Sequence, residues 1–351
     1  MPLVKNAAGT DRRSWLKSFG LGAVAAGVAG RFPLLSGEPA RAGAAAAGRS
    51  IRIAHLTDVH LQPERGAVEA FTQCLHHVQS QVDRPDLILF TGDLIMDSYR
   101  KDDARTALQW DLWNRVLKAE CSLPHMALLG NHDIWGWDKK KSKTTGNEPG
   151  WGKRRACDHL ELARPYYSFD RNGWHFVMLD SVQPFGDGKE YLARLDAEQM
   201  AWLAGDLEQH AGRPTIVLSH IPIFSVTPLM GIKPGDGITP DGRHQSVIGQ
   251  GGMHTDWREL KALFRQHGNV TVALSGHMHL IDRVDYLGTS YLCGGAVSGG
   301  WWKEVHLGEG DAGYSLIDLY DDGRFAREYV TYGWKYKDAP VPTTNPVSAA
   351  H

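Results

Sequence analysis

Five short motifs rich in Asp, Asn and His occur between residues 58 and 279, and their side chains are common ligands of divalent metals. The motifs are Asp58-Val59-His60, Gly92-Asp93, Gly130-Asn131-His132-Asp133, Ser219-His220 and Gly276-His277-Met278-His279. Any one of them has an ordinary alternative, since Asn and Asp also cap helices and form turns. Together they offer carboxylate, amide and imidazole ligands, which suit hard or borderline cations. The combination therefore predicts a metal site.

The spacing within the motifs favours two ions. Asp58 and His60 lie two residues apart, so an extended segment directs both to one side, and His277 and His279 share that spacing. The carboxylate of Asp93 can bridge two cations. Two ions about 3.5–4 Å apart can hold the attacking and leaving oxygens of a phosphate and activate a bridging water as hydroxide. The chemistry that we expect is phosphoester hydrolysis.

His132 is the candidate proton donor for this chemistry. It follows the candidate ligand Asn131 directly, so it is expected to reach the leaving oxygen as a general acid. Asp133 is expected to orient His132 through a hydrogen bond.

The elements around the motifs predict an α/β domain. Apolar segments precede all five motifs, and sites in α/β sheets form at the carboxyl ends of strands. These predicted strands are residues 51–56, 87–90, 126–129, 215–218 and 270–274. Further strands are expected near 166–170, 174–180, 281–286, 289–293, 314–320 and 325–332, helices near 66–81, 102–119, 196–210 and 256–267, and long loops over 134–165 and 221–255. Asn172-Gly173 indicates a hairpin turn.

In their order and composition, the five motifs resemble the conserved blocks of the calcineurin-like metallophosphoesterases. The resemblance implies a four-layer α/β/β/α sandwich, with two mixed β-sheets flanked by helices. It implies that one metal binds Asp58, His60, Asp93 and His279, and that the other binds Asp93, Asn131, His220 and His277. It also implies that His132 is the catalytic histidine. The metals remain open among Fe, Mn, Zn and Co.

The second block departs from the family pattern. Asp97 stands four residues after Asp93, whereas the usual second acid follows after three. Purple acid phosphatases carry a tyrosine ligand just beyond the Asp that corresponds to Asp93. Here Met96 and Asp97 occupy that region, and Tyr99 lies further on. The sequence therefore favours a bacterial phosphodiesterase-like or phosphatase-like member over that branch.

The first 42 residues resemble a twin-arginine export signal peptide. Arg12-Arg13 precedes an apolar Gly/Ala-rich run over 19–30, and Ala40-Arg41-Ala42 forms a cleavage site. The run is too short for a good membrane span. We therefore expect a passenger of the twin-arginine machinery, periplasmic or extracellular and without a transmembrane anchor. The phosphoesterase domain is expected over 51–335, followed by a C-terminal tail over 336–351.

Charge and cysteine content limit the partners. Without residues 1–42, the chain has 38 − 6 = 32 Lys and Arg against 40 − 2 = 38 Asp and Glu, a net charge of −6. An acidic chain is a poor match for nucleic acid, so a small phosphoester is the expected substrate. None of the four cysteines forms a Cys-x-x-Cys pair, which argues against a zinc–thiolate site. A nuclease and a non-catalytic metal-binding scaffold are the alternative functions.

Three residues outside the motifs are candidates for substrate binding. Trp135 follows the third motif, and Trp301 lies in Gly299-Gly300-Trp301-Trp302 beyond the last. Either indole can stack on a base or cover an apolar alcohol, but either can equally anchor its loop. His254, near the end of the second long loop, is a candidate phosphate contact, although a surface position is the alternative.

Overall fold

The computed structural model describes residues 48–186, 190–230, 235–303 and 311–336. The expected signal peptide (1–42) lies outside the described residues, as does all of the expected tail except Tyr336. Within the described ranges, none of the helices combines the length and hydropathy needed to cross a bilayer.

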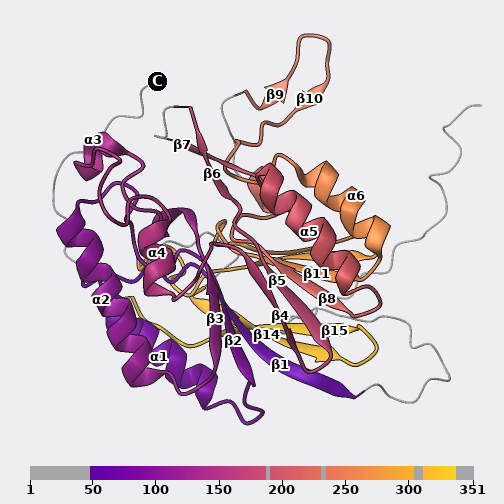
Figure 1. Cartoon of the computed structure of the whole chain (residues 1–351), viewed down its shortest axis with the longest axis horizontal. Coiled ribbons are helices and arrows are strands. Elements are labelled where there is room, and N and C mark those ends of the chain that lie inside the picture. The colour runs from indigo at the N-terminus through magenta and orange to yellow at the C-terminus, as the bar shows by residue number, and fades with distance from the viewer. Residues whose placement is uncertain (1–47, 187–189, 231–234, 304–310, 337–351) are drawn as a thin grey trace, which may run out of the picture. The chain divides into compact units, whose positions relative to one another are not determined.

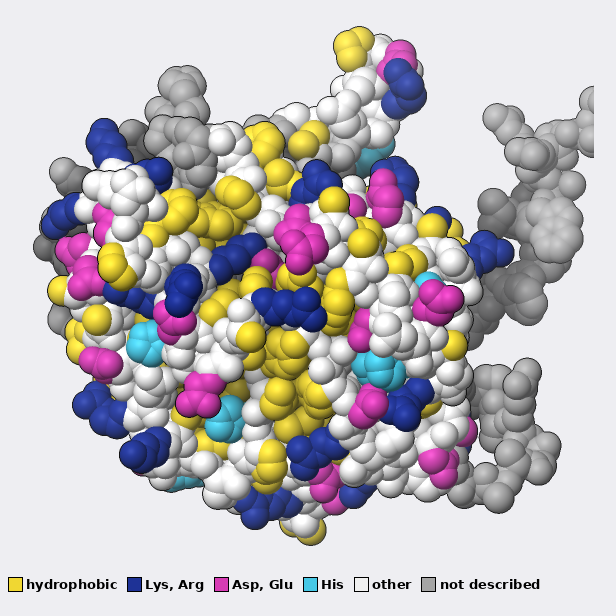
Figure 2. Space-filling view, viewed as in Figure 1, with side chains coloured by type: hydrophobic (Ala, Val, Ile, Leu, Met, Phe, Trp, Pro, Cys, Tyr) yellow, Lys and Arg dark blue, Asp and Glu magenta, His cyan; other side chains and the backbone are white. Residues whose placement is uncertain are grey.

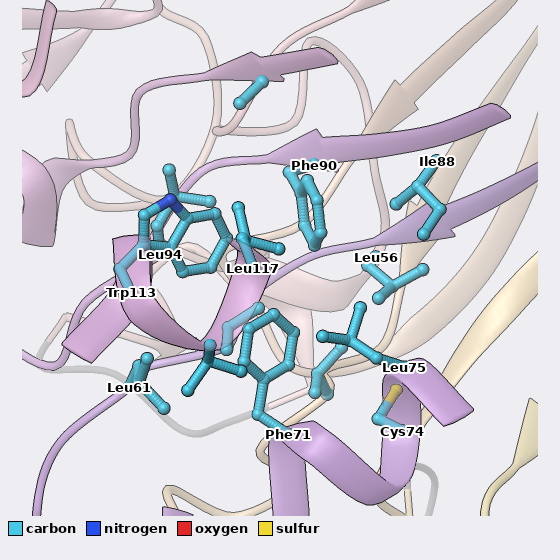
Figure 3. Close-up of a cluster of buried hydrophobic side chains, with 14 of the residues drawn as sticks. Leu56, Leu61, Phe71, Cys74, Leu75, Ile88, Phe90, Leu94, Trp113 and Leu117 are labelled. Atoms are coloured by element: carbon cyan, nitrogen blue, oxygen red, sulfur yellow. The ribbon is translucent and has the colours of Figure 1, made fainter. Parts of the chain in front are cut away.

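The first sheet has three neighbouring parallel strands, and two antiparallel pairings extend it at one edge. Its strands, in spatial order, are β15 (Phe325–Thr331), β14 (Gly313–Tyr320), β1 (Arg49–Leu56), β2 (Leu87–Thr91) and β3 (His125–Leu128). Helices α1 (Ala67–Gln79) and α2 (Asp103–Glu120) pack on its outer face. Phe71 stacks on Trp113 with ring centroids 5.4 Å apart, and Phe90 of β2 meets both rings (Figure 3).

The second sheet is mixed as well. Its strands, in spatial order, are β12 (Ile281–Tyr286), β13 (Thr289–Gly294), β11 (Val270–Ser275), β8 (Thr215–Leu218), β5 (Trp174–Met178) and β4 (Tyr167–Arg171). Helices α5 (Ala197–Gln209) and α6 (Trp257–His267) cover its outer face. Strands β5, β8, β11 and β13 run parallel, so their carboxyl ends lie along the same edge.

The inner faces of the two sheets share one buried core. Ile53 and Leu89 from the first sheet pack with Phe176 and Leu218 from the second. The order of layers is therefore helices, sheet, sheet, helices, and Figure 1 shows α1 and α2 on one side and α5 and α6 on the other. The predicted four-layer α/β/β/α fold class is confirmed.

Both expected long loops contain short elements that the sequence pattern does not indicate. Residues 134–165 include α3 (Lys139–Ser142) and α4 (Arg154–His159), and 221–255 include a 3₁₀ turn (Thr227–Leu229) and the strands β9 (Gly237–Ile238) and β10 (His244–Gln245). A hairpin of β6 (Val182–Phe185) and β7 (Glu190–Ala193) was also missed. These elements have two to six residues, too few for a hydrophobic period to show.

A buried histidine, His175 of β5, is paired with carboxylates on both sides. Its Nε2 lies 2.7 Å from Asp206 of α5, and its Nδ1 lies 2.8 Å from Asp170 of β4. The ring of His210 stacks on it at 3.7 Å, and Arg213 pairs with Asp170. Burial opposes the charged imidazole, but the hydrogen bonds to Asp206 and Asp170 outweigh it and raise the pKa of His175 above its usual value.

This arrangement predicts a pH-dependent contribution to stability. Because the folded pKa of His175 is raised, its contribution is fully present below the unfolded pKa of about 6.5 and disappears as the pH rises through the folded pKa. We expect the difference in urea midpoint between wild type and His175→Gln to be larger at pH 6 than at pH 9. An equal difference at both pH values would show that the charge of His175 contributes nothing.

Candidate functional site

All five motifs lie where a strand ends. Asp58, Asp93 and Asn131 follow β1, β2 and β3 of the first sheet, whereas His220 and His277 follow β8 and β11 of the second. Five of the seven expected ligands adopt a left-handed backbone, with φ between 49° and 68°; they are Asp58, His60, Asp93, His277 and His279. Such conformations are costly for non-glycine residues and concentrate at functional sites.

One group of side chains joins the first motif to the last. The Nε2 atoms of His60 and His279 lie 3.1 Å apart, although 219 residues separate them in sequence. Asp58 Oδ1 lies 3.3 Å from His279 Nε2 and 3.7 Å from His60 Nε2. Asp58, His60 and His279 are buried and direct potential ligand atoms to one point.

A second group adjoins the first through Asp93. Asp93 Oδ2 lies 3.2 Å from His220 Nε2 and 3.6 Å from His60 Nε2, so it faces both groups. His220 Nε2 is also 3.1 Å from Asn131 Oδ1 and 3.3 Å from His277 Nδ1. All seven expected ligands therefore converge, and Asp93 lies between the two groups.

Backbone carbonyls orient two of the histidines. Gly299 O lies 2.7 Å from His279 Nδ1, and Thr91 O lies 2.8 Å from His220 Nδ1. A carbonyl can only accept, so each Nδ1 carries a hydrogen, and Nε2 is the nitrogen left to bind a metal when the ring is neutral. This is how metal-binding histidines are held in their ligating tautomer.

The hydrogen-bonding pattern of Asp58 fits a metal ligand. Its Oδ2 accepts from the Thr57 hydroxyl at 2.7 Å and from the His277 amide at 2.8 Å. Its Oδ1 is buried and has no hydrogen-bond donor. An unsatisfied buried carboxylate oxygen is costly, and a cation held by Asp58, His60 and His279 would satisfy it. The residues present therefore fit metal ions.

The charges of the site shift several pKa values. Burial disfavours the ionised form of Asp93, but His220, His132 and His60 outweigh it and hold the pKa of Asp93 below its usual range. In return, the carboxylates of Asp93 and Asp58 overcome burial and raise the pKa of His220 to about 9. Burial and the neighbouring His220 lower the pKa of His277 to about 3. The site is thus a strongly coupled cluster of opposite charges.

His132 lies beside this cluster, but Asp133 does not orient it as expected. A ring nitrogen of His132 is within 4.8 Å of ligand atoms of His60 and Asp93, and its Nδ1 lies 2.7 Å from the Met96 carbonyl. The carboxylate of Asp133 instead accepts the backbone amides of Leu94, Ile95 and Gly130. The expected hydrogen bond is wrong because Asp133 points into the turns that carry Asp93 and Asn131.

That position alters the protonation of Asp133. Burial, reinforced by the charge of Asp93, raises its pKa to about 7. Asp133 therefore supports the ligand turns rather than the proton donor.

The two candidate tryptophans differ in their surroundings. Trp301 lies against the site, with its ring centroid 4.0 Å from that of His60, 4.6 Å from that of His279 and 5.1 Å from that of His132. Trp135 is buried, donates its indole N–H to the Lys101 carbonyl and is covered by the Arg155 guanidinium at 3.7 Å. These contacts anchor the loop after Asn131, which is the alternative role considered for Trp135.

His254 is neither exposed nor free to bind phosphate. It is buried, with Nε2 3.0 Å from the Ser219 hydroxyl and Nδ1 2.8 Å from Asp256. Both ring nitrogens are therefore engaged within the protein. His254 ties the end of the second long loop to the residue before His220, and the expected phosphate contact is wrong for this reason.

Two residues near the site were missed from sequence. The indole N–H of buried Trp302 donates to the His60 carbonyl at 2.9 Å, so it holds the turn of the first motif. Tyr191 of β7 meets the ring of His277 edge-on, with centroids 6.3 Å apart. The position of Trp302 beside Trp301 in sequence was a signal for its role in supporting the site. No sequence motif adjacent to Tyr191 indicates that it lies near His277.

Comparison with known proteins agrees with this geometry. The family model described as calcineurin-like phosphoesterase matches residues 51–280. The chain is 25% identical over 310 residues to a 3′,5′-cyclic-nucleotide phosphodiesterase of Nostoc sp. (strain PCC 7120), covering 85% of this chain and 95% of that protein. It is 28% identical over 225 residues to purple acid phosphatase 22 of Arabidopsis thaliana, covering 62% of this chain but only 43% of that longer protein.

A solved structure supports the fold. A dimetal phosphatase from Danio rerio aligns with a TM-score of 0.53 at 15% identity, covering 81% of this chain and 97% of that one. The fold of this chain is therefore that of known metallophosphoesterases.

The close approach of two motifs at Gly276 provides a test of the site. A Cβ at Gly276 would collide with the Thr57 hydroxyl and with Asp58 Oδ2. We expect Gly276→Ala to displace Asp58 and lower metal affinity by about 10- to 100-fold, the usual effect of disturbing residues that support ligands. Calorimetric titration with Mn²⁺ or Zn²⁺ measures this.

The matched control is Gly205→Ala in α5, where a Cβ meets no atom within 4 Å. It should bind metal like wild type. Unchanged metal affinity in Gly276→Ala would contradict the site as described.

Proposed function

We propose that this chain, a member of the calcineurin-like phosphoesterase family, hydrolyses a small phosphodiester with two metal ions. Members of this family are hydrolases that act on phosphoesters. The observation that carries the proposal is the position of Asp93, whose Oδ2 faces His60 in one group of ligands and His220 in the other. Fe, Mn, Zn or Co would suit these ligands.

The proposed roles divide the site. Asp58, His60, Asp93 and His279 would hold one ion, and Asp93, Asn131, His220 and His277 would hold the other. When bound, the ions supply Lewis-acid activation of the phosphate and of water.

His132 is proposed to donate the proton to the leaving oxygen. The Met96 carbonyl 2.7 Å from Nδ1 holds the ring in place and requires a hydrogen on that atom, so Nε2 is the nitrogen that exchanges the proton. The backbone amide of His132 also donates to Asp93 Oδ1 at 2.8 Å, which ties the proton donor to the shared ligand.

A phosphodiester is the favoured substrate class because the Nostoc relative, which spans most of both chains, is named as a phosphodiesterase. Phosphomonoester hydrolysis is the second candidate, supported by the partial likeness to a purple acid phosphatase. A nuclease fits less well. On the face in Figure 2, Lys and Arg side chains are interspersed with Asp and Glu and do not form a continuous basic surface.

A non-catalytic metal scaffold is the remaining alternative. It would require neither a proton donor nor a complete set of ligands. All seven candidate ligands converge here, and His132 lies beside them. We therefore favour catalysis.

The direct test is hydrolysis of bis-p-nitrophenyl phosphate and p-nitrophenyl phosphate by protein loaded with defined metals. We expect release of nitrophenol by the wild type and its loss in Asp93→Asn, because the amide cannot act as an anionic bridge between two cations. Asp97→Asn is the matched control. It makes the same chemical change four residues away, where the Asp97 carboxylate accepts only the Arg100 amide among the described contacts. Inactivity of the metal-loaded wild type toward both esters would refute the proposal.

We further propose export by the twin-arginine route, on the basis of the N-terminal residues described above. Replacing Arg12 and Arg13 with Lys should retain the protein in the cytoplasm, because that machinery requires the arginine pair. Fractionation with N-terminal sequencing checks this, and the exported wild type should begin at Gly43. Export of the Lys-Lys variant at the wild-type level would count against the route.

A further inference from the structure

The loop that follows β13, residues 295–303, brings an indole face to the site. Trp301 is half-buried, and its ring is tilted by only 22° from that of His279 and by 35° from that of His60. It also meets His132 at a tilt of 57°. Trp301 therefore contacts both histidines of the Asp58 group and the proposed proton donor.

This loop is attached to the site by contacts that do not involve the Trp301 ring. Ser298 N donates to the Asp58 carbonyl at 3.2 Å, and the Gly299 carbonyl accepts from His279 at 2.7 Å. Trp302 donates to the His60 carbonyl, and Arg65 donates to the Trp301 carbonyl at 3.0 Å. Since the backbone is held on both sides of Trp301, its ring has a defined position.

The backbone conformation at Trp301 favours glycine over tryptophan. Its φ is 64°, in the left-handed region where glycine is preferred and a bulky side chain is an outlier. Five expected ligands and Trp302 share this left-handed conformation. Trp302 also donates a hydrogen bond to the His60 carbonyl. A bulky aromatic in this conformation next to the ligands is the kind of strain that accompanies a functional role.

We propose that Trp301 is a specificity-determining residue that selects phosphoesters whose leaving group carries a flat aromatic ring. The inference rests on the proposed function, because His132 must reach the leaving oxygen to protonate it. The leaving group must then lie beside His132, and the indole of Trp301 contacts both His132 and His60. Stacking on an indole accepts any planar ring, so it selects a class of leaving group rather than one compound.

The experiment compares benzyl and propyl phosphates, as monoesters and as symmetric diesters, in metal-loaded wild type, Trp301→Ala and Trp301→Phe. Both leaving groups are primary alcohols that take a proton from the same general acid, so the change in the ratio of their kcat/KM values between variants reports recognition of the ring. We expect this ratio to fall about tenfold in Trp301→Ala, within the range for loss of one stacking partner. Trp301→Phe should largely restore it.

The matched control is Trp202→Ala. Trp202 lies on α5 against Tyr166 and Arg164, and its described contacts do not include the site. It should leave the benzyl-to-propyl ratio unchanged. Equal losses of activity toward both esters in Trp301→Ala would overturn the proposal, since they would mean that Trp301 only supports the metal ligands.

Calorimetric binding of benzylphosphonate and propylphosphonate separates this proposal from the proposed function. A wild type that cleaves no ester but prefers benzylphosphonate, with the preference lost in Trp301→Ala, refutes the hydrolase and retains the aromatic selectivity. A wild type that binds both phosphonates equally overturns the role of Trp301 even if the enzyme is active.

Discussion

The carboxylate of Asp93 is buried between histidines that come from opposite sheets, and the arrangement of the site depends on it. A buried carboxylate without partners is strongly unfavourable. Here Oδ2 faces His220, which follows the second sheet, and His60, which follows the first, while Oδ1 accepts the His132 amide. The same position is the basis of the role proposed for Asp93, that of a ligand shared by two metal ions.

The backbone around Asp93 shows what this convergence requires. Asp93 follows Gly92, and Gly130 approaches so closely that an added Cβ would overlap the Asp93 carboxylate. Five of the seven candidate ligands have a left-handed backbone, a conformation that concentrates at functional sites. Asp133 stabilises the turns after β2 and β3 by accepting the backbone amides of Leu94, Ile95 and Gly130. The site is therefore built from tight backbone turns on a rigid core.

Most of the main elements were predictable from local sequence. The strands before the five motifs and the helices α1, α2, α5 and α6 fall within a few residues of their predicted positions, since each has a clear hydrophobic pattern. The short hairpin β6–β7 was not predictable, because Val182-Gln-Pro-Phe185 contains a proline and lacks a sustained period. Tyr191 of that hairpin lies against the ring of His277, so the contact of Tyr191 with the site was not predictable either.

The sequence by itself determined the inventory of the site: which side chains are candidate metal ligands, that their motifs follow strands, and the family to which the chain belongs. Those properties are local, because residue type and strand pattern are readable from neighbouring positions. The tertiary structure decided the orientation of the groups, including the carbonyls of Met96 and Gly299 that hold His132 and His279, and the internal contacts of His254. It also decided which tryptophan faces the site. Trp135 and Trp301 both follow motif segments in sequence, but only packing across the two sheets places Trp301 against His60 and His279.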